Sequence, residues 1–137
     1  MDDSKLSTSS GKNILSDEVV NEIKSKLKTF EEQKGFLEPN LTIPIVAKMI
    51  GSNRSHISYV LNDHFHISFS TYLKVLRINY VTNLFLEDNK YLNYKLESLA
   101  EMCGMANRQV FSANFLGING IRPTDFIRKR KEELGIS

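Results

Sequence analysis

The chain has 137 residues, of which 41% are hydrophobic and 25% charged, which is enough for one compact domain with a sizeable core. No apolar run reaches the roughly 18 residues of a membrane span, the polar N-terminus is not a secretory signal, and the single cysteine, Cys103, excludes a disulfide framework and a cysteine-based zinc finger. The net charge of +2 is uneven: residues 1–40 hold six Lys against eight Asp or Glu (−2), whereas residues 41–137 hold twelve Lys or Arg against eight (+4), which permits a nucleic-acid partner without demanding one.

Three segments are expected along the chain. Residues 1–14 include the low-complexity run Ser7–Gly11, which cannot bury enough surface to offset its ordering entropy, so they are predicted to form a disordered tail. Residues 15–37 are predicted to form an N-terminal helix, and residues 38–137 a helical domain. The scarcity of glycine (7) and proline (3) favours an all-α fold, and the single cysteine fits a cytoplasmic location.

The N-terminal helix has a start signal, a stop signal and one apolar face. Ser16 is the predicted N-cap, because its oxygen can accept from an unpaired N–H, and Asp17 and Glu18 favour the positive end of the helix dipole. Gly35 is the predicted stop. The apolar face consists of Val19, Val20, Ile23, Leu27 and Phe30. Pairing with a second copy is one use of this face, but packing onto its own domain is favoured.

A first pair of short helices is predicted over residues 41–67. Thr42 is a suitable N-cap, Pro44 is tolerated in the first turn, and Gly51 ends the first helix. Its inner face consists of Ile43, Val46, Ala47 and Ile50. After a turn of two residues, a second helix begins at Arg54. Its apolar positions are Ile57, Val60 and Leu61. Two short helices joined by a glycine-containing turn form a helix-turn-helix unit.

The longest predicted helix links this unit to a second one. Ser68 is its N-cap, and within the linker of residues 68–88 the helix from about Phe69 to Leu86 extends roughly 25 Å at about 1.5 Å per residue. Its apolar stripe consists of Tyr72, Leu73, Leu76, Ile78, Val81, Leu84 and Phe85. This stripe makes the linker a candidate for a rigid spacer.

The helix-turn-helix pattern recurs over residues 93–133. Gly104 takes the place of Gly51 in the turn. The inward positions of the second unit are Leu96, Leu99, Ala100, Cys103, Phe111, Asn114 and Phe115. Gly120 and Pro123 then precede a last helix that starts at Thr124. The second unit is therefore an internal repeat of the first.

Two such units joined by one long helix resemble the DNA-binding domain of the AraC/XylS family of bacterial transcription regulators. The resemblance covers about Leu41 to Arg130. The matching residues are Ala47, Gly51, Ser55, Ile57, Leu61, Ser68, Phe69, Tyr72, Leu73, Arg77, Ile78, Leu96, Leu99, Ala100, Gly104, Phe111, Phe115, Gly120, Pro123 and Phe126. The resemblance implies an all-α fold with two helix-turn-helix subdomains, a linker helix and double-stranded DNA as the partner.

Some positions differ from the family. Met105 stands where Phe is usual, a swap that conserves volume, and Leu116 and Gly117 stand where basic residues are common. The N-terminal helix lies outside the usual domain, and residues 30–43 look like the helix that precedes this domain in regulators of the Bacteroidetes type. Those regulators are longer, so the chain is expected to be the output end of a larger sensor, and a membrane anchor in the parent protein is left open.

The second helix of each unit is the candidate reader of the DNA major groove. In the first reader, Ser55, Ser58 and Tyr59 match the family's base-facing positions, and hydroxyl groups can bond base edges. Asn53 and Arg54, at the start of that helix, are predicted to hold phosphates. The alternative is that these residues form an ordinary solvated face.

In the second reader, two side chains with planar groups that can form paired hydrogen bonds indicate base recognition. Arg108 suits guanine and Gln109 suits adenine, and Ser112 is the third predicted base contact. Asn107 is predicted to hold a phosphate, as is Thr124, where the last helix presents unpaired N–H groups. An ordinary polar surface is again the alternative.

The sequence predicts a DNA-binding module of a transcription regulator that inserts two recognition helices into adjacent major-groove segments, about 34 Å apart. The alternative is a helical protein-interaction module of a signalling protein that does not read DNA. No catalytic constellation, metal site or cofactor motif stands out, so we expect no enzyme, no cofactor and no metal. RNA polymerase and a homodimer formed through upstream regions remain open as further partners, and no membrane contact is expected of this segment.

Arg77 is expected to bond backbone carbonyls or an acid inside the bundle.

Overall fold

The computed structural model describes residues 14–137, and within this range the chain is built from helices without strands. The α-helices are α1 (Asp17–Glu32), α2 (Ile43–Ile50), α3 (Arg54–Tyr59), α4 (Phe69–Glu87), α5 (Leu96–Met102), α6 (Arg108–Asn119) and α7 (Pro123–Leu134). Short 3-10 turns follow α1 (Gly35–Leu37) and α4 (Asn89–Asn93), and a π-helical turn (Val60–His64) extends α3. The predicted tail lies, except for Ile14, outside the described residues.

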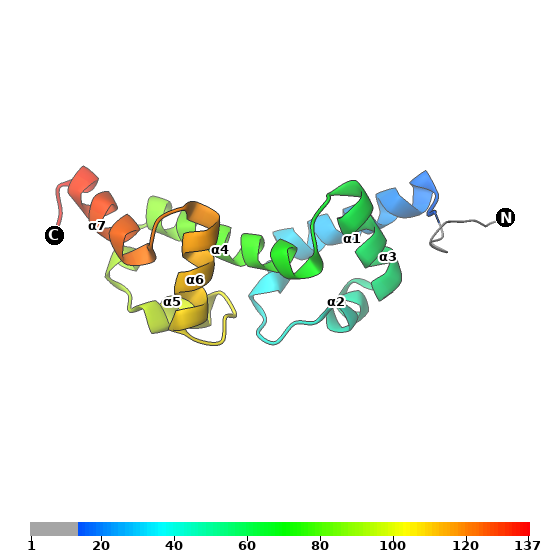
Figure 1. Cartoon of the computed structure of the whole chain (residues 1–137), viewed down its shortest axis with the longest axis horizontal. Coiled ribbons are helices and arrows are strands. Elements are labelled where there is room, and N and C mark those ends of the chain that lie inside the picture. Colours follow the sequence, from blue (N-terminus) through cyan, green and yellow to red (C-terminus); the bar gives the residue numbers. More distant parts are fainter. Residues whose placement is uncertain (1–13) are drawn as a thin grey trace.

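The molecule is elongated, with α4 running lengthwise between two helical subdomains (Figure 1). The first subdomain contains α1, α2 and α3, and the second contains α5, α6 and α7. Each has its own hydrophobic core, and α4 supplies side chains to both: Tyr72 and Leu73 to the first core, Val81 and Phe85 to the second. The predicted tandem arrangement around one linker helix is confirmed.

Helix α1 is part of the first core. Ser16 caps it by accepting from the Val19 N–H at 3.2 Å, as predicted. Its predicted apolar face lies against the helix-turn-helix unit, which confirms packing onto its own domain. The buried members of that face are Val20, Ile23, Leu27 and Phe30.

The predicted stop of α1 at Gly35 is wrong. The helix ends at Glu32, and Lys34, not Gly35, takes the left-handed conformation with φ 58°. Gly35 is required for a different reason: a Cβ on it would lie 2.6 Å from Cδ1 of the Phe30 ring. The position is therefore restricted by the space that the Phe30 ring occupies.

The first helix-turn-helix unit follows its sequence signals closely. The Thr42 oxygen accepts from the Ile45 N–H at 3.4 Å, and Gly51 ends α2 with φ 70°. The apolar positions predicted for the second helix are fully buried: Ile57, Val60 and Leu61. The π-helical turn that prolongs this helix to His64 was not predicted.

Arg77 ties the segment after α1 to the linker helix. It is 9% exposed, and its Nε and Nη2 donate to the backbone oxygens of Phe36 and Glu38 at 2.7 and 2.6 Å. Burial lowers the pKa of this guanidinium, yet arginine stays protonated at neutral pH. The expected structural role of Arg77 is confirmed.

The second unit repeats the first on a core of aromatic rings. Phe111 and Phe115 of α6 are fully buried, and the Phe115 ring packs on Phe85 of α4 and Phe126 of α7. Gly104, in the turn, has φ 80°, close to the value of Gly51. The internal repeat predicted from the sequence is thus also a repeat of backbone geometry.

Candidate nucleic-acid interface

The outward face of α3 is only partly open. Arg54 and Ser55 are exposed, as predicted, whereas Ser58 and Tyr59 are half-buried. The Tyr59 ring packs edge-on against His64, with ring centroids 5.7 Å apart. Asn62, one turn beyond Ser58, is exposed. The residues presented most freely here are therefore Arg54 and Ser55 of α3 and Asn62 of the π-helical turn.

The two asparagines that precede the readers have the same role in both units. The Asn53 Oδ1 accepts from the His56 N–H, and the Asn107 Oδ1 accepts from the Val110 N–H, each at 2.9 Å. Both are N-caps, a role that was not predicted for them. Because the Oδ1 atoms are used in capping, the predicted phosphate contacts would be made by the amide NH₂ groups, which remain available as donors.

The outward face of α6 carries the bidentate groups. Arg108 and Gln109 are exposed. The Arg108 Nη1 lies 3.7 Å from the Glu97 carboxylate, and both side chains are more than half exposed. Such surface pairs contribute little to stability, so this guanidinium can exchange its partner at small cost. Ser112 is half-buried.

Three apolar residues also lie on this helix outside its buried face, and sequence reasoning gave none of them a DNA contact. Val110 and Leu116 are 40% and 43% exposed, and Ala113 is exposed as well. At about 100° per residue, Ala113 lies on the side of α6 opposite the buried Phe111 and Phe115. The helical periodicity of the sequence could have revealed this position. Small apolar side chains on a recognition helix can pack against the methyl groups of thymine.

A hollow of about 200 Å³ lies beside α6, where the last helix begins. It brings together Ser112 and Thr124, predicted to contact bases and phosphates respectively, and adds Arg122, which sequence reasoning missed. Arg122 is exposed and immediately precedes α7, whose first N–H groups have no intrahelical partners. A cation beside unpaired N–H groups suits a phosphate.

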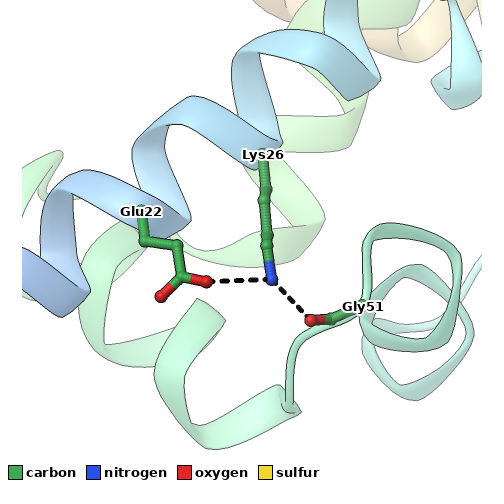
Figure 2. A network of polar contacts seen from close by, with 3 residues as sticks. All are labelled: Glu22, Lys26 and Gly51. Carbon is green, nitrogen blue, oxygen red and sulfur yellow. Dashed lines mark hydrogen bonds and ion pairs between the residues drawn. The ribbon is translucent and has the colours of Figure 1, made fainter.

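On the first unit, α1 holds the turn that leads into α3. Figure 2 shows that the Lys26 ammonium donates to the Gly51 backbone oxygen at 2.6 Å while lying 3.4 Å from the Glu22 carboxylate. Gly51 ends α2, so this cation sits where helix carbonyls are unpaired. Helix α1 thus contacts Gly51, which is two residues before Asn53, the N-cap of α3.

Two buried groups outside the proposed interface have raised pKa values, Cys103 and Tyr72. Burial raises the pKa of the Cys103 thiol to about 11, so it stays protonated at neutral pH. The Tyr72 hydroxyl donates to Glu31 at 2.6 Å, and burial followed by that contact raises its pKa. Residues 14–137 contain no group of three or more His, Cys, Asp or Glu side chains placed to hold a metal ion. No helix in this range is long and apolar enough to cross a membrane.

Solved structures show which fold this is. The C-terminal domain of AraT, a response regulator from Geobacillus stearothermophilus, is 23% identical over 84% of this chain and 87% of its own, with a TM-score of 0.61. An AraC-type transcriptional regulator from Chromobacterium violaceum is 16% identical over 84% and 96%, with a TM-score of 0.66. A DNA-binding transcriptional dual regulator from Escherichia coli is 16% identical over 88% and 99%, with a TM-score of 0.63. No protein-family model and no curated relative matches the sequence.

The chain therefore has the fold of an AraC-type DNA-binding domain. These matches cover more of the chain than residues 38–137 make up, so they include part of the N-terminal segment. Helix α1 shares the first core with the helix-turn-helix unit. That it lies outside the usual domain of the family stays a prediction. A relationship to the Bacteroidetes type stays a prediction.

Proposed function

We propose that this chain binds double-stranded DNA sequence-specifically as part of a bacterial transcription regulator, with α3 and α6 as its two readers. The observation that carries the proposal is that both helices present exposed polar side chains on their outward sides: Ser55 on α3, and Arg108 and Gln109 on α6. The subdomains that contain α3 and α6 lie toward opposite ends of α4 (Figure 1). A helix fits the major groove, which is about 12 Å wide, only if its outward side is free.

Each reader has its own contribution in this proposal. In the second reader, Arg108 and Gln109 contact base edges, and half-buried Ser112 makes a weaker base contact. In the first reader, Ser55 and the partly covered Ser58 and Tyr59 supply weaker base contacts. Phosphates are held by the positions around the helix starts: Asn53, Arg54, Asn107 and Thr124, with Arg122 added from the structure.

The proposal also includes the location of the chain in the cell and the kind of protein to which it belongs. Two of the similar structures are C-terminal domains of response regulators. By analogy, this chain acts in the cytoplasm as the output part of a longer signalling protein, without catalytic activity of its own.

Selection of bound sites from random duplexes tests the proposal. The wild-type chain should enrich a site with two half-sites, and its affinity should fall steeply with salt, because binding releases counterions from the DNA. Arg108→Ala should weaken binding to the selected site by ~1–3 kcal/mol and relax the preference at one base pair. Arg128→Ala, which removes an exposed arginine paired with Asp125 on α7, is the matched control and should keep the preference.

Two outcomes count against the proposal. Absence of duplex binding at low salt would favour the protein-interaction module instead. An equal loss for Arg108→Ala on every sequence would reduce that residue to a phosphate contact and remove it from base recognition.

A further inference from the structure

A groove of about 380 Å³ crosses the junction between the two subdomains. Its first wall is the start of α2, with Asn40 and Thr42; its floor is α4; and its second wall is the turn before α6 and the side of α6 that carries Val110 and Asn114. It is the place where both units and the linker meet, and none of the predicted contacts lies in it.

The charge of this groove is one-sided. Its floor holds two cations, Lys74 and Arg77, one turn apart on α4, and no Asp or Glu lines it. Lys74 is exposed and forms no ion pair with a described residue. Arg77 is 9% exposed and uses Nε and Nη2 on backbone oxygens, whereas its Nη1 donates to no described residue. Two cations without an acid, surrounded by hydroxyl and amide groups, define an anion site.

The position of the groove indicates which anion it takes. A reader in the major groove has a phosphate backbone on each side of it. The hollow with Arg122 and Thr124 lies on one side of α6, the side of Ser112, and this groove lies on the other, the side of Val110 and Asn114. The two cationic hollows thus flank the second reader as two backbones would.

We propose that Lys74 and Arg77 bind a phosphate of the DNA backbone between the two half-sites, so that the inter-subdomain groove is a third contact with the duplex. This proposal rests on the proposed function. A phosphate held there touches both subdomains at once and fixes their register on the DNA, without reading a base.

The test is the salt dependence of binding to a fixed duplex. Lys74→Gln should make the slope of log affinity against log salt about 0.9 shallower, the value for one phosphate contact on B-DNA. Lys74→Arg should restore the wild-type slope. Lys28→Gln, which removes an exposed lysine of α1 that lines none of these hollows, should leave it unchanged. Arg77 is left intact because its hydrogen bonds hold the fold.

The outcomes separate this inference from the proposed function. Wild-type binding with an unchanged slope for Lys74→Gln overturns the groove contact and leaves DNA binding intact. Failure of the wild-type chain to bind duplex overturns both. Inorganic phosphate, titrated against the DNA-free chain and followed by thermal stability, distinguishes the sources: a Lys74-dependent shift together with an unchanged DNA slope assigns the groove to a free anion and overturns the backbone contact.

Discussion

At the scale of single residues, two glycines in equivalent turns face different surroundings. Gly51 and Gly104 both have left-handed φ values, 70° and 80°. A Cβ on Gly51 would have only the Lys26 ammonium nearby, at 3.9 Å, whereas a Cβ on Gly104 would lie 2.6 Å from the Leu37 backbone oxygen. The two glycines are equivalent in the sequence repeat, but Gly104 lies where the second unit closely approaches the segment after α1.

This difference predicts unequal costs of the same substitution. Gly51→Ala should lower the free energy of unfolding by about 1–2 kcal/mol, the cost of a left-handed residue with a side chain. Gly104→Ala should cost clearly more, because the Leu37 backbone must also move. Urea unfolding of both variants measures the two costs, and equal costs would show that the Leu37 segment yields freely.

At the scale of helices, local signals predicted starts better than ends. The predicted caps Ser16, Thr42 and Ser68 all accept from the N–H three residues on, because capping is a contact within one turn. The end of α1 at Glu32 and the π-helical turn after α3 were not foreseen, because no glycine or proline in the sequence marks either position. For the readers, the apolar inward positions Ile57, Val60, Leu61, Phe111 and Phe115 were correct, whereas Asn114 is half-buried and lines a groove. The apolar part of the outward α6 face was overlooked, because polar residues alone were sought there.

The contact between α1 and the first turn gives a prediction at this scale. Lys26→Met keeps the aliphatic stem but removes the ammonium from the Gly51 oxygen, so the free energy of unfolding should fall by about 1 kcal/mol, a modest value for a side chain that is 32% exposed. Lys28→Met, on the exposed side of the same helix, should have no measurable effect. Urea unfolding compares the two variants, and equal effects would remove the Lys26 contact as a stabilising link.

For the whole molecule, the linker fixes how far apart the readers can be. Helix α4 has 19 residues and so spans about 28 Å, and it is anchored in both cores. Adjacent major-groove segments on one side of the duplex are about 34 Å apart. If α3 and α6 read adjacent major-groove segments as proposed, a linker without a flexible joint requires the DNA to bend, at a cost of a few kcal/mol.

A rigid spacer predicts a strict half-site spacing. Inserting 5 base pairs between the selected half-sites turns the second one to the opposite side of the duplex, and inserting 10 restores the side but doubles the distance. Both inserts should reduce affinity to that of a single half-site, measured at fixed salt, whereas the same inserts outside the half-sites should have no effect. Two units on a flexible tether would tolerate the 10-base-pair insert, because only the side of the duplex would matter to them. Retained affinity with that insert would therefore contradict the rigid role of α4 and, with it, the fixed register on which simultaneous reading by α3 and α6 depends.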